Sequence, residues 1–147
     1  MDMAPTLGRS LSLALERLVP LLRSLAAGEV SPTAYAALAR LEGGAIRLSE
    51  LATAVAVTQP AMTQLVNRME ADGLVVRTRS DDDRRGVLVG LAGHGRGLLR
   101  ARRERRIALL DMLAARLDEA DRAAIEGALP ALGRLIQHVQ DEGTNRS

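Results

Sequence analysis

The chain has 147 residues, of which 47% are hydrophobic and 1% aromatic, and its 20 basic and 18 acidic side chains give a formal net charge of +2. This length predicts one compact domain, and the lack of cysteine excludes disulfide scaffolds, thiol catalysis and thiolate metal sites. No apolar run approaches the roughly 20 residues that a membrane span needs, and the first residues lack the layout of a signal peptide. We therefore expect a cytoplasmic protein with no membrane partner.

The basic residues are concentrated in one part of the chain. All 20 are arginines, and residues 60–106 contain 11 of them against 6 acidic residues. The local charge of this segment is therefore +5, whereas the remainder carries −3. A basic segment in a chain of mild net charge is a candidate surface for an anionic partner such as nucleic acid.

Two amphipathic helices are predicted first. Over residues 7–27 an apolar stripe suited to packing on another helix is formed by Leu11, Leu15, Leu18, Leu22 and Leu25. Pro20 lies inside this stripe, where we expect a kink or a break. Ser31 and Pro32 predict the N-cap and first position of a second helix, which ends at residues 43–44.

A tight turn at residues 56–57 is predicted to join two further helices. Ser49 is expected to cap a short helix, and Thr58 to cap a second one that begins at Gln59. The second helix has an apolar side made of Met62, Leu65, Val66 and Met69. Its other side is polar, and Gly73 closes it.

From Leu74 the hydrophobic period changes to two, which predicts a strand, the charged loop 80–86, and an antiparallel return strand over 87–91. Residues 93–117 return to a helical pattern, and Asp118 can cap a last helix. Its apolar stripe is Ile125, Leu129, Leu132, Ile136 and Val139. The predicted fold class is therefore mainly α with a small antiparallel β wing, in a winged helix-turn-helix arrangement.

This order of elements suits the binding of a DNA duplex, because a helix fits the major groove and a β-ribbon beside it can reach the backbone or the minor groove. In chain order the candidate contacts are Thr58, Gln59, Thr63, Gln64, Asn67, Arg68, Arg77, Arg79, Arg84 and Arg85. Thr58, Gln59 and Thr63 can meet a phosphate at the N-terminus of the helix. The amides of Gln64 and Asn67 can pair with adenine. Arg68 can reach guanine or a phosphate, the strand arginines can contact the backbone, and the last two can enter a narrow minor groove. Asp83 is expected to orient an arginine of the wing.

Four stretches resemble the MarR family of bacterial transcription regulators, namely residues 48–52, 58–63, 69–77 and 82–85. The Asp-Arg-Arg wing combined with the Glu-Ala-Asp-Gly-Leu-Val helix exit is the specific part of this resemblance. The chain departs from the family pattern at Ala92, where the family usually has a capping threonine. The turn between the two short helices often carries glycine in helix-turn-helix proteins, and here it carries Ala56.

The resemblance implies a six-helix homodimer in which residues 1–30 and 93–147 hold the subunits together and residues 31–92 form the DNA-binding domain. It further implies a pseudo-palindromic operator as the DNA partner, a repressor role, and release by a small-molecule effector. The identity of the effector and the residues of its pocket are not indicated. With one tyrosine and no other aromatic residue, the sequence hints only at an apolar cleft with an arginine for an anionic group. Pro20 and Pro130 both lie inside helices that are expected to dimerise.

Other interpretations of the same residues carry different functions. The arginines of residues 96–106 are interpreted as a solvated helix face in preference to a second DNA patch. His94 and His138 have no partner at ligand spacing, so we expect no metal site and no cofactor. No nucleophile is paired with a base, which disfavours an enzyme. The main alternative is a winged-helix module that binds a protein, although Tyr35 is the sole aromatic anchor.

Overall fold

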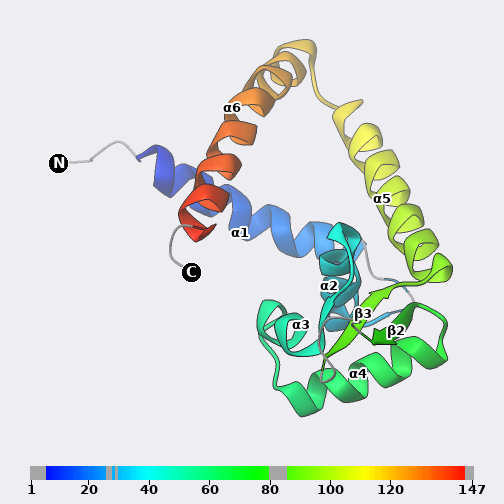
Figure 1. Cartoon of the computed structure of the whole chain (residues 1–147). Helices are drawn as coiled ribbons and strands as arrows, with labels where there is room; N and C mark the ends of the chain where they lie inside the picture. Colours follow the sequence, from blue (N-terminus) through cyan, green and yellow to red (C-terminus); the bar gives the residue numbers. More distant parts are fainter. Residues whose placement is uncertain (1–5, 26–27, 29, 80–85, 145–147) are drawn as a thin grey trace. The chain divides into compact units, whose positions relative to one another are not determined.

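The computed structural model describes residues 6–25, 28, 30–79 and 86–144 (Figure 1). The elements in chain order are α1 (Leu7–Leu25), α2 (Pro32–Arg40), the 3₁₀ turn η1 (Leu41–Gly43), β1 (Ile46–Arg47), α3 (Leu48–Ala54), α4 (Gln59–Ala71), β2 (Val75–Arg79), β3 (Val87–Leu91), α5 (Gly93–Ala114) and α6 (Glu119–Thr144). The predicted class, mainly α with a small antiparallel sheet, is confirmed. The chain divides into two compact units, Met1–Arg106 and Ile107–Ser147. Among the helices so described, none combines the length and the apolar character that crossing a bilayer requires.

Three predicted helix caps are confirmed. The Ser31 hydroxyl before α2 and the Thr58 hydroxyl before α4 each accept a hydrogen bond from the backbone N–H three residues on, at 3.2 and 3.4 Å. The Asp118 carboxylate before α6 does the same at 2.8 Å. Each bond satisfies one of the N–H groups that a helix start leaves without an intrahelical partner.

The predicted cap at Ser49 is wrong. The residue before α3 is Arg47, whose side chain makes no capping bond, and Ser49 is already helical. The reason is β1, because its pairing with β3 carries extended backbone up to Arg47 and the helix starts immediately afterwards. The Ser49 carbonyl instead accepts a bond from the Thr53 hydroxyl at 3.1 Å.

The sheet has three strands in the order β1-β3-β2, all antiparallel. The predicted pair is confirmed, with Val75 opposite Leu91 and Arg79 opposite Val87. The third strand is absent from the sequence prediction, because two residues are too few to show an alternating pattern. By pairing with β3, β1 ties the start of α3 to the sheet.

The core of the first unit lies between α2, α3, α4, the sheet and the start of α5. Its largest fully buried side chains are Leu38, Leu41, Leu51, Met62, Val66, Val75 and Val89. All four residues of the predicted apolar side of α4 are buried. This confirms which side of α4 faces outward, because the helix has no other buried position.

Two turns hold α4 in place through left-handed backbone conformations. Gly73 after the helix has φ +70°, as expected for a C-terminal glycine. Ala56, in the turn between α3 and α4, has φ +57°. For a residue with a Cβ this conformation costs about 1 kcal/mol of folding free energy relative to its usual helical region.

Of the kink or break expected at Pro20, the break does not occur, since α1 is one helix from Leu7 to Leu25 with the proline inside it. Proline removes one backbone donor, and the hydrogen bonds of the flanking turns continue the helix. In the second unit, α6 likewise contains Pro130.

Both long terminal helices expose apolar side chains in this single chain. On α1, Leu15 and Leu18 are 53% and 44% exposed. On α6 the exposed apolar residues are Ile125, Leu129, Leu132, Leu135 and Ile136.

Candidate nucleic-acid interface

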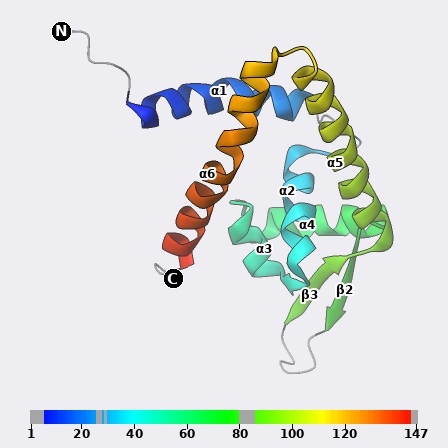
Figure 2. The same ribbon diagram turned by 90° about the horizontal axis from the view of Figure 1, so that it is seen from above.

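The outward side of α4 is polar and open to solvent. Gln64, Asn67 and Arg68 are exposed there, along with Gln59 in the first turn. Figure 2 shows β2 and β3 as a paired ribbon beside this helix. A polar helix face next to a β-ribbon has the dimensions to enter a major groove while the ribbon meets the flanking backbone.

The N-terminus of α4 differs from the prediction in one detail. Thr58 is exposed, and because its oxygen accepts the capping bond, its hydroxyl proton remains available for a phosphate. Thr63 is half-buried, and its hydroxyl donates to the Gln59 carbonyl at 2.9 Å. Thr63 therefore has no donor left for an anion, whereas Thr58 keeps one.

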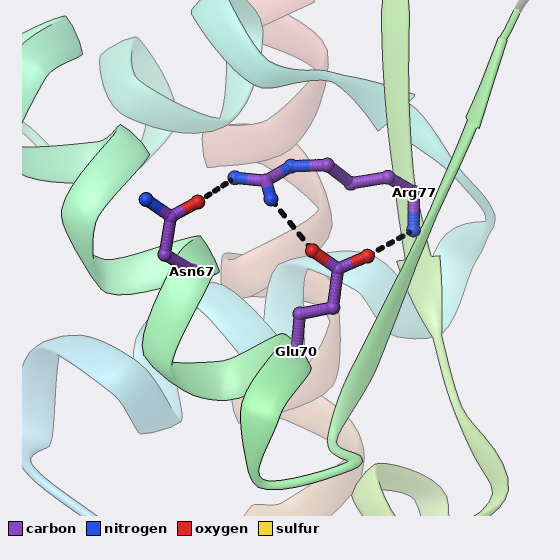
Figure 3. Close-up of polar contacts among 3 residues, drawn as sticks. All are labelled: Asn67, Glu70 and Arg77. Carbon is purple, nitrogen blue, oxygen red and sulfur yellow. Dashed lines mark hydrogen bonds and ion pairs between the residues drawn. The ribbon is translucent and has the colours of Figure 1, made fainter.

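The structure brings Asn67 into direct contact with Arg77, and Arg77 also bonds Glu70, a residue that the sequence analysis missed as part of the site (Figure 3). One guanidinium nitrogen of Arg77 donates to the Asn67 side-chain oxygen at 2.6 Å. The other donates to the Glu70 carboxylate, also at 2.6 Å. The second carboxylate oxygen of Glu70 accepts the backbone N–H of Arg77 at 3.3 Å. Three contacts thus join the exposed side of α4 to β2.

No single signal in the sequence would have revealed this cluster. Glu70 and Asn67 are one helical turn apart, which is visible in the sequence. Their distance from Arg77 depends on how the turn at Gly73 folds β2 back against α4, and that is a property of the tertiary structure.

The predicted wing tip lies outside the described residues. This applies to Asp83, Arg84 and Arg85, and for Arg79 the structure describes the strand position in β2 but not the side chain. The roles predicted for these four residues stay predictions.

The sequence analysis expected all the arginines of α5 to be solvated, and the structure shows that one of them is buried. Arg96, Arg100 and Arg105 are exposed. Arg102 is 9% exposed, and its guanidinium lies 3.6 Å from the centre of the Tyr35 ring. This departure arises because the ring offers a cation–π partner inside the first unit. Arg103 donates to both carboxylate oxygens of Glu42 at 3.0 Å.

A cavity of about 980 Å³ opens beside this buried arginine. Its wall includes apolar side chains from α1 and α2 together with Arg102 and Arg106. The Nε atom of Arg102 is buried and has no hydrogen-bond partner among the described residues. Over all the residues that the structure describes, no cluster of three or more metal-ligating side chains occurs.

The short α3, the capped α4 and the β2–β3 ribbon define a winged helix-turn-helix protein. The model of the MarR family matches residues 29–86. A curated relative, the uncharacterized HTH-type transcriptional regulator YfiV of Bacillus subtilis (strain 168), is 26% identical over 99 residues, which are 67% of this chain. The match spans 62% of the length of that relative.

Solved structures of other proteins share the fold. A protein described as a transcriptional regulator from Pseudomonas aeruginosa PA01 is 30% identical, with a TM-score of 0.73 over 89% of this chain and 93% of that one. A point mutant of MepR of Staphylococcus aureus, solved bound to an oligodeoxyribonucleotide, is 17% identical, with a TM-score of 0.67 over 85% of this chain and 96% of that one. The chain belongs to the MarR family of transcriptional regulators.

Proposed function

We propose that the protein is a homodimeric, sequence-specific DNA-binding repressor whose subunits read two half-sites of a pseudo-palindromic operator. The observation that carries this proposal is the exposed polar side of α4, capped at Thr58 and joined to β2 through Arg77. The DNA-bound MepR structure, which has the same fold, supports a duplex as the partner. The membership of the family supports a regulatory role without an enzymatic activity.

The dimer is supported by apolar surface that a single chain leaves in water. Leu15 on α1 and Leu129 and Ile136 on α6 are each more than half exposed. Burying one leucine or isoleucine side chain stabilises an assembly by about 1.5–3 kcal/mol, so several on each subunit favour self-association. Two linked half-sites then bind DNA more tightly than one.

Selection from a random duplex pool tests the DNA-binding proposal. We expect the chain to enrich an inverted repeat whose affinity falls steeply with salt concentration. Gln64→Ala should remove about tenfold discrimination between the preferred base and the others at one base pair of each half-site. A bidentate contact between an amide and a base contributes discrimination of that size. Gln137→Ala, an equivalent change on the exposed surface of α6, should leave the selected sequence unchanged.

Failure of the selection would overturn the proposal. If no duplex is enriched, and a partner protein is recovered with the chain after nuclease treatment, the winged helix serves a protein interaction. The polar face of α4 disfavours this alternative, because protein interfaces depend on aromatic anchors and Tyr35, the only aromatic residue, is half-buried.

The effector is proposed to be a small apolar molecule with an anionic group. The cavity beside Arg102 offers apolar walls, and the unpartnered Nε and the nearby Arg106 favour a negative charge. An effector acts only if it binds one arrangement of the dimer better than the other. Hexanoate should therefore weaken duplex binding several-fold in a fluorescence anisotropy titration. Arg106→Ala should blunt this response and Arg105→Ala should not, and an equal response in all three proteins would contradict the assignment.

A further inference from the structure

The contacts of Asn67 restrict what this residue can offer to a base. An asparagine pairs with adenine by accepting a hydrogen bond through its oxygen and donating one through its nitrogen. In this structure the Asn67 oxygen already accepts a bond from Arg77 at 2.6 Å. The residue is exposed, so its amide nitrogen, with two N–H donors, is the group that faces outward for a ligand.

The orientation of this amide follows from chemistry. Arginine has five N–H donors and no acceptor, so an amide nitrogen turned toward Arg77 would set donor against donor. A hydrogen bond from a charged donor is about twice as strong as one between neutral groups. The Arg77 contact therefore holds the oxygen inward and the nitrogen outward.

Glu70 keeps Arg77 in this position. Its carboxylate accepts hydrogen bonds from one guanidinium nitrogen of Arg77 at 2.6 Å and from the Arg77 backbone N–H at 3.3 Å. Both the guanidinium and the backbone of the arginine are therefore held in place. The pair lies near the surface, with 40% of the Glu70 side chain and 26% of the Arg77 side chain exposed. The pairing also neutralises a carboxylate that would otherwise repel a phosphate backbone.

From this geometry we infer that Glu70 and Arg77 are positioning residues that make Asn67 a reader of guanine. Guanine presents two acceptors, N7 and O6, in the major groove, whereas adenine presents one acceptor and one donor. A donor-only amide thus satisfies guanine and leaves the adenine amino group without a partner. Arg77 acts through Asn67 and, while paired with Glu70, does not serve as a backbone contact. The inference rests on the proposed DNA-binding function.

Binding-site selection with the full chain and its variants tests this inference. The base pair read by Asn67 is the one at which Asn67→Ala flattens the preference. The unaltered protein should select guanine there, and Arg77→Leu, which frees the amide oxygen, should shift the preference toward adenine by about tenfold. In this variant the base preference at the position read by Gln64 should stay the same. A general loss of structure would instead weaken the preference at both positions. Circular dichroism melting verifies that each variant is folded.

The salt dependence of binding gives a second readout. Glu70→Gln removes the charge partner of Arg77 and releases the guanidinium to a phosphate, so the slope of log affinity against log salt should steepen by about one. Glu50→Gln removes an equal charge from the first turn of α3, away from Arg77 in the sequence, and should leave the slope unchanged.

The outcomes separate the inference from the function on which it rests. Sequence-selective binding with adenine preferred at the Asn67 position, or an Arg77→Leu variant that weakens every sequence equally, overturns the inference and leaves the DNA-binding function standing. A chain that enriches no duplex at all overturns both.

Discussion

Gly95→Ala should lower the free energy of unfolding by about 3 kcal/mol or prevent folding, because the site has no room for a methyl group. Gly95 is buried in the first turn of α5, and a Cβ built there would lie 2.1 Å from the carbonyl oxygen of Leu74. That oxygen also accepts the backbone N–H of Ala92 at 3.0 Å. The contact is with the backbone of the residue immediately before β2, so no side-chain rotation can relieve it.

Gly97→Ala is the matched control for this prediction. It lies two residues further along the same helix, and a Cβ there would meet no atom within 4 Å among the described residues. Alanine is the better helix former, so this variant should gain about 0.5–1 kcal/mol. Thermal and urea unfolding followed by circular dichroism measure both changes. A Gly95→Ala protein as stable as the Gly97→Ala protein would show that α5 does not approach Leu74 this closely.

The close approach of α5 to Leu74 is a feature of the fold that the sequence could not predict, whereas most helices could be predicted. The helices were predictable because caps such as Ser31 and Thr58 and the apolar side of α4 are local patterns. The role of Gly95 was not, because the sequence Gly-His-Gly-Arg-Gly looks like an ordinary strand-to-helix turn. Its requirement for glycine comes from Leu74, which is distant along the chain.

The turn before α4 illustrates the same limit. Its position at residues 56–57 was predicted, and the positive φ of Ala56 agrees with the glycine that such turns often carry. The two-residue strand β1 was missed, and with it the true start of α3. Sequence periodicity cannot reveal pairing between segments so far apart, because pairing depends on the register of β1 with β3.

In the candidate interface, residue types were predictable and their partners were not. Gln64, Asn67 and Arg68 are exposed on α4, where the helical period placed them. Arg77 was expected as an independent backbone contact, and it is instead bonded to Asn67 and Glu70. A sequence pattern identifies which side of a helix is exposed. The partners of a long arginine side chain depend on which residues the fold brings within hydrogen-bonding distance of it.

Ile136→Arg should convert the proposed dimer into a monomer and weaken binding to a duplex with two half-sites by about 100-fold. Ile136 is 58% exposed on α6 and continues the apolar stripe that includes Ile125 and Leu129. A buried, unpaired guanidinium in an apolar interface costs far more than one isoleucine contributes, so the dimer would not tolerate it. Binding to a duplex with a single half-site should change little, because α4 and β2 are untouched.

Ala123→Arg separates this effect from added charge. Ala123 is exposed on the other side of α6, away from the apolar stripe, so the substitution adds the same positive charge without entering the proposed interface. Analytical ultracentrifugation should find this control dimeric and Ile136→Arg monomeric. If Ile136→Arg remains a dimer with full affinity, the stripe on α6 is not where the subunits meet, and the linkage of two reading helices must come from α1 or from another surface. The single-site and paired-site affinities would then decide whether two α4 helices act on one duplex at all.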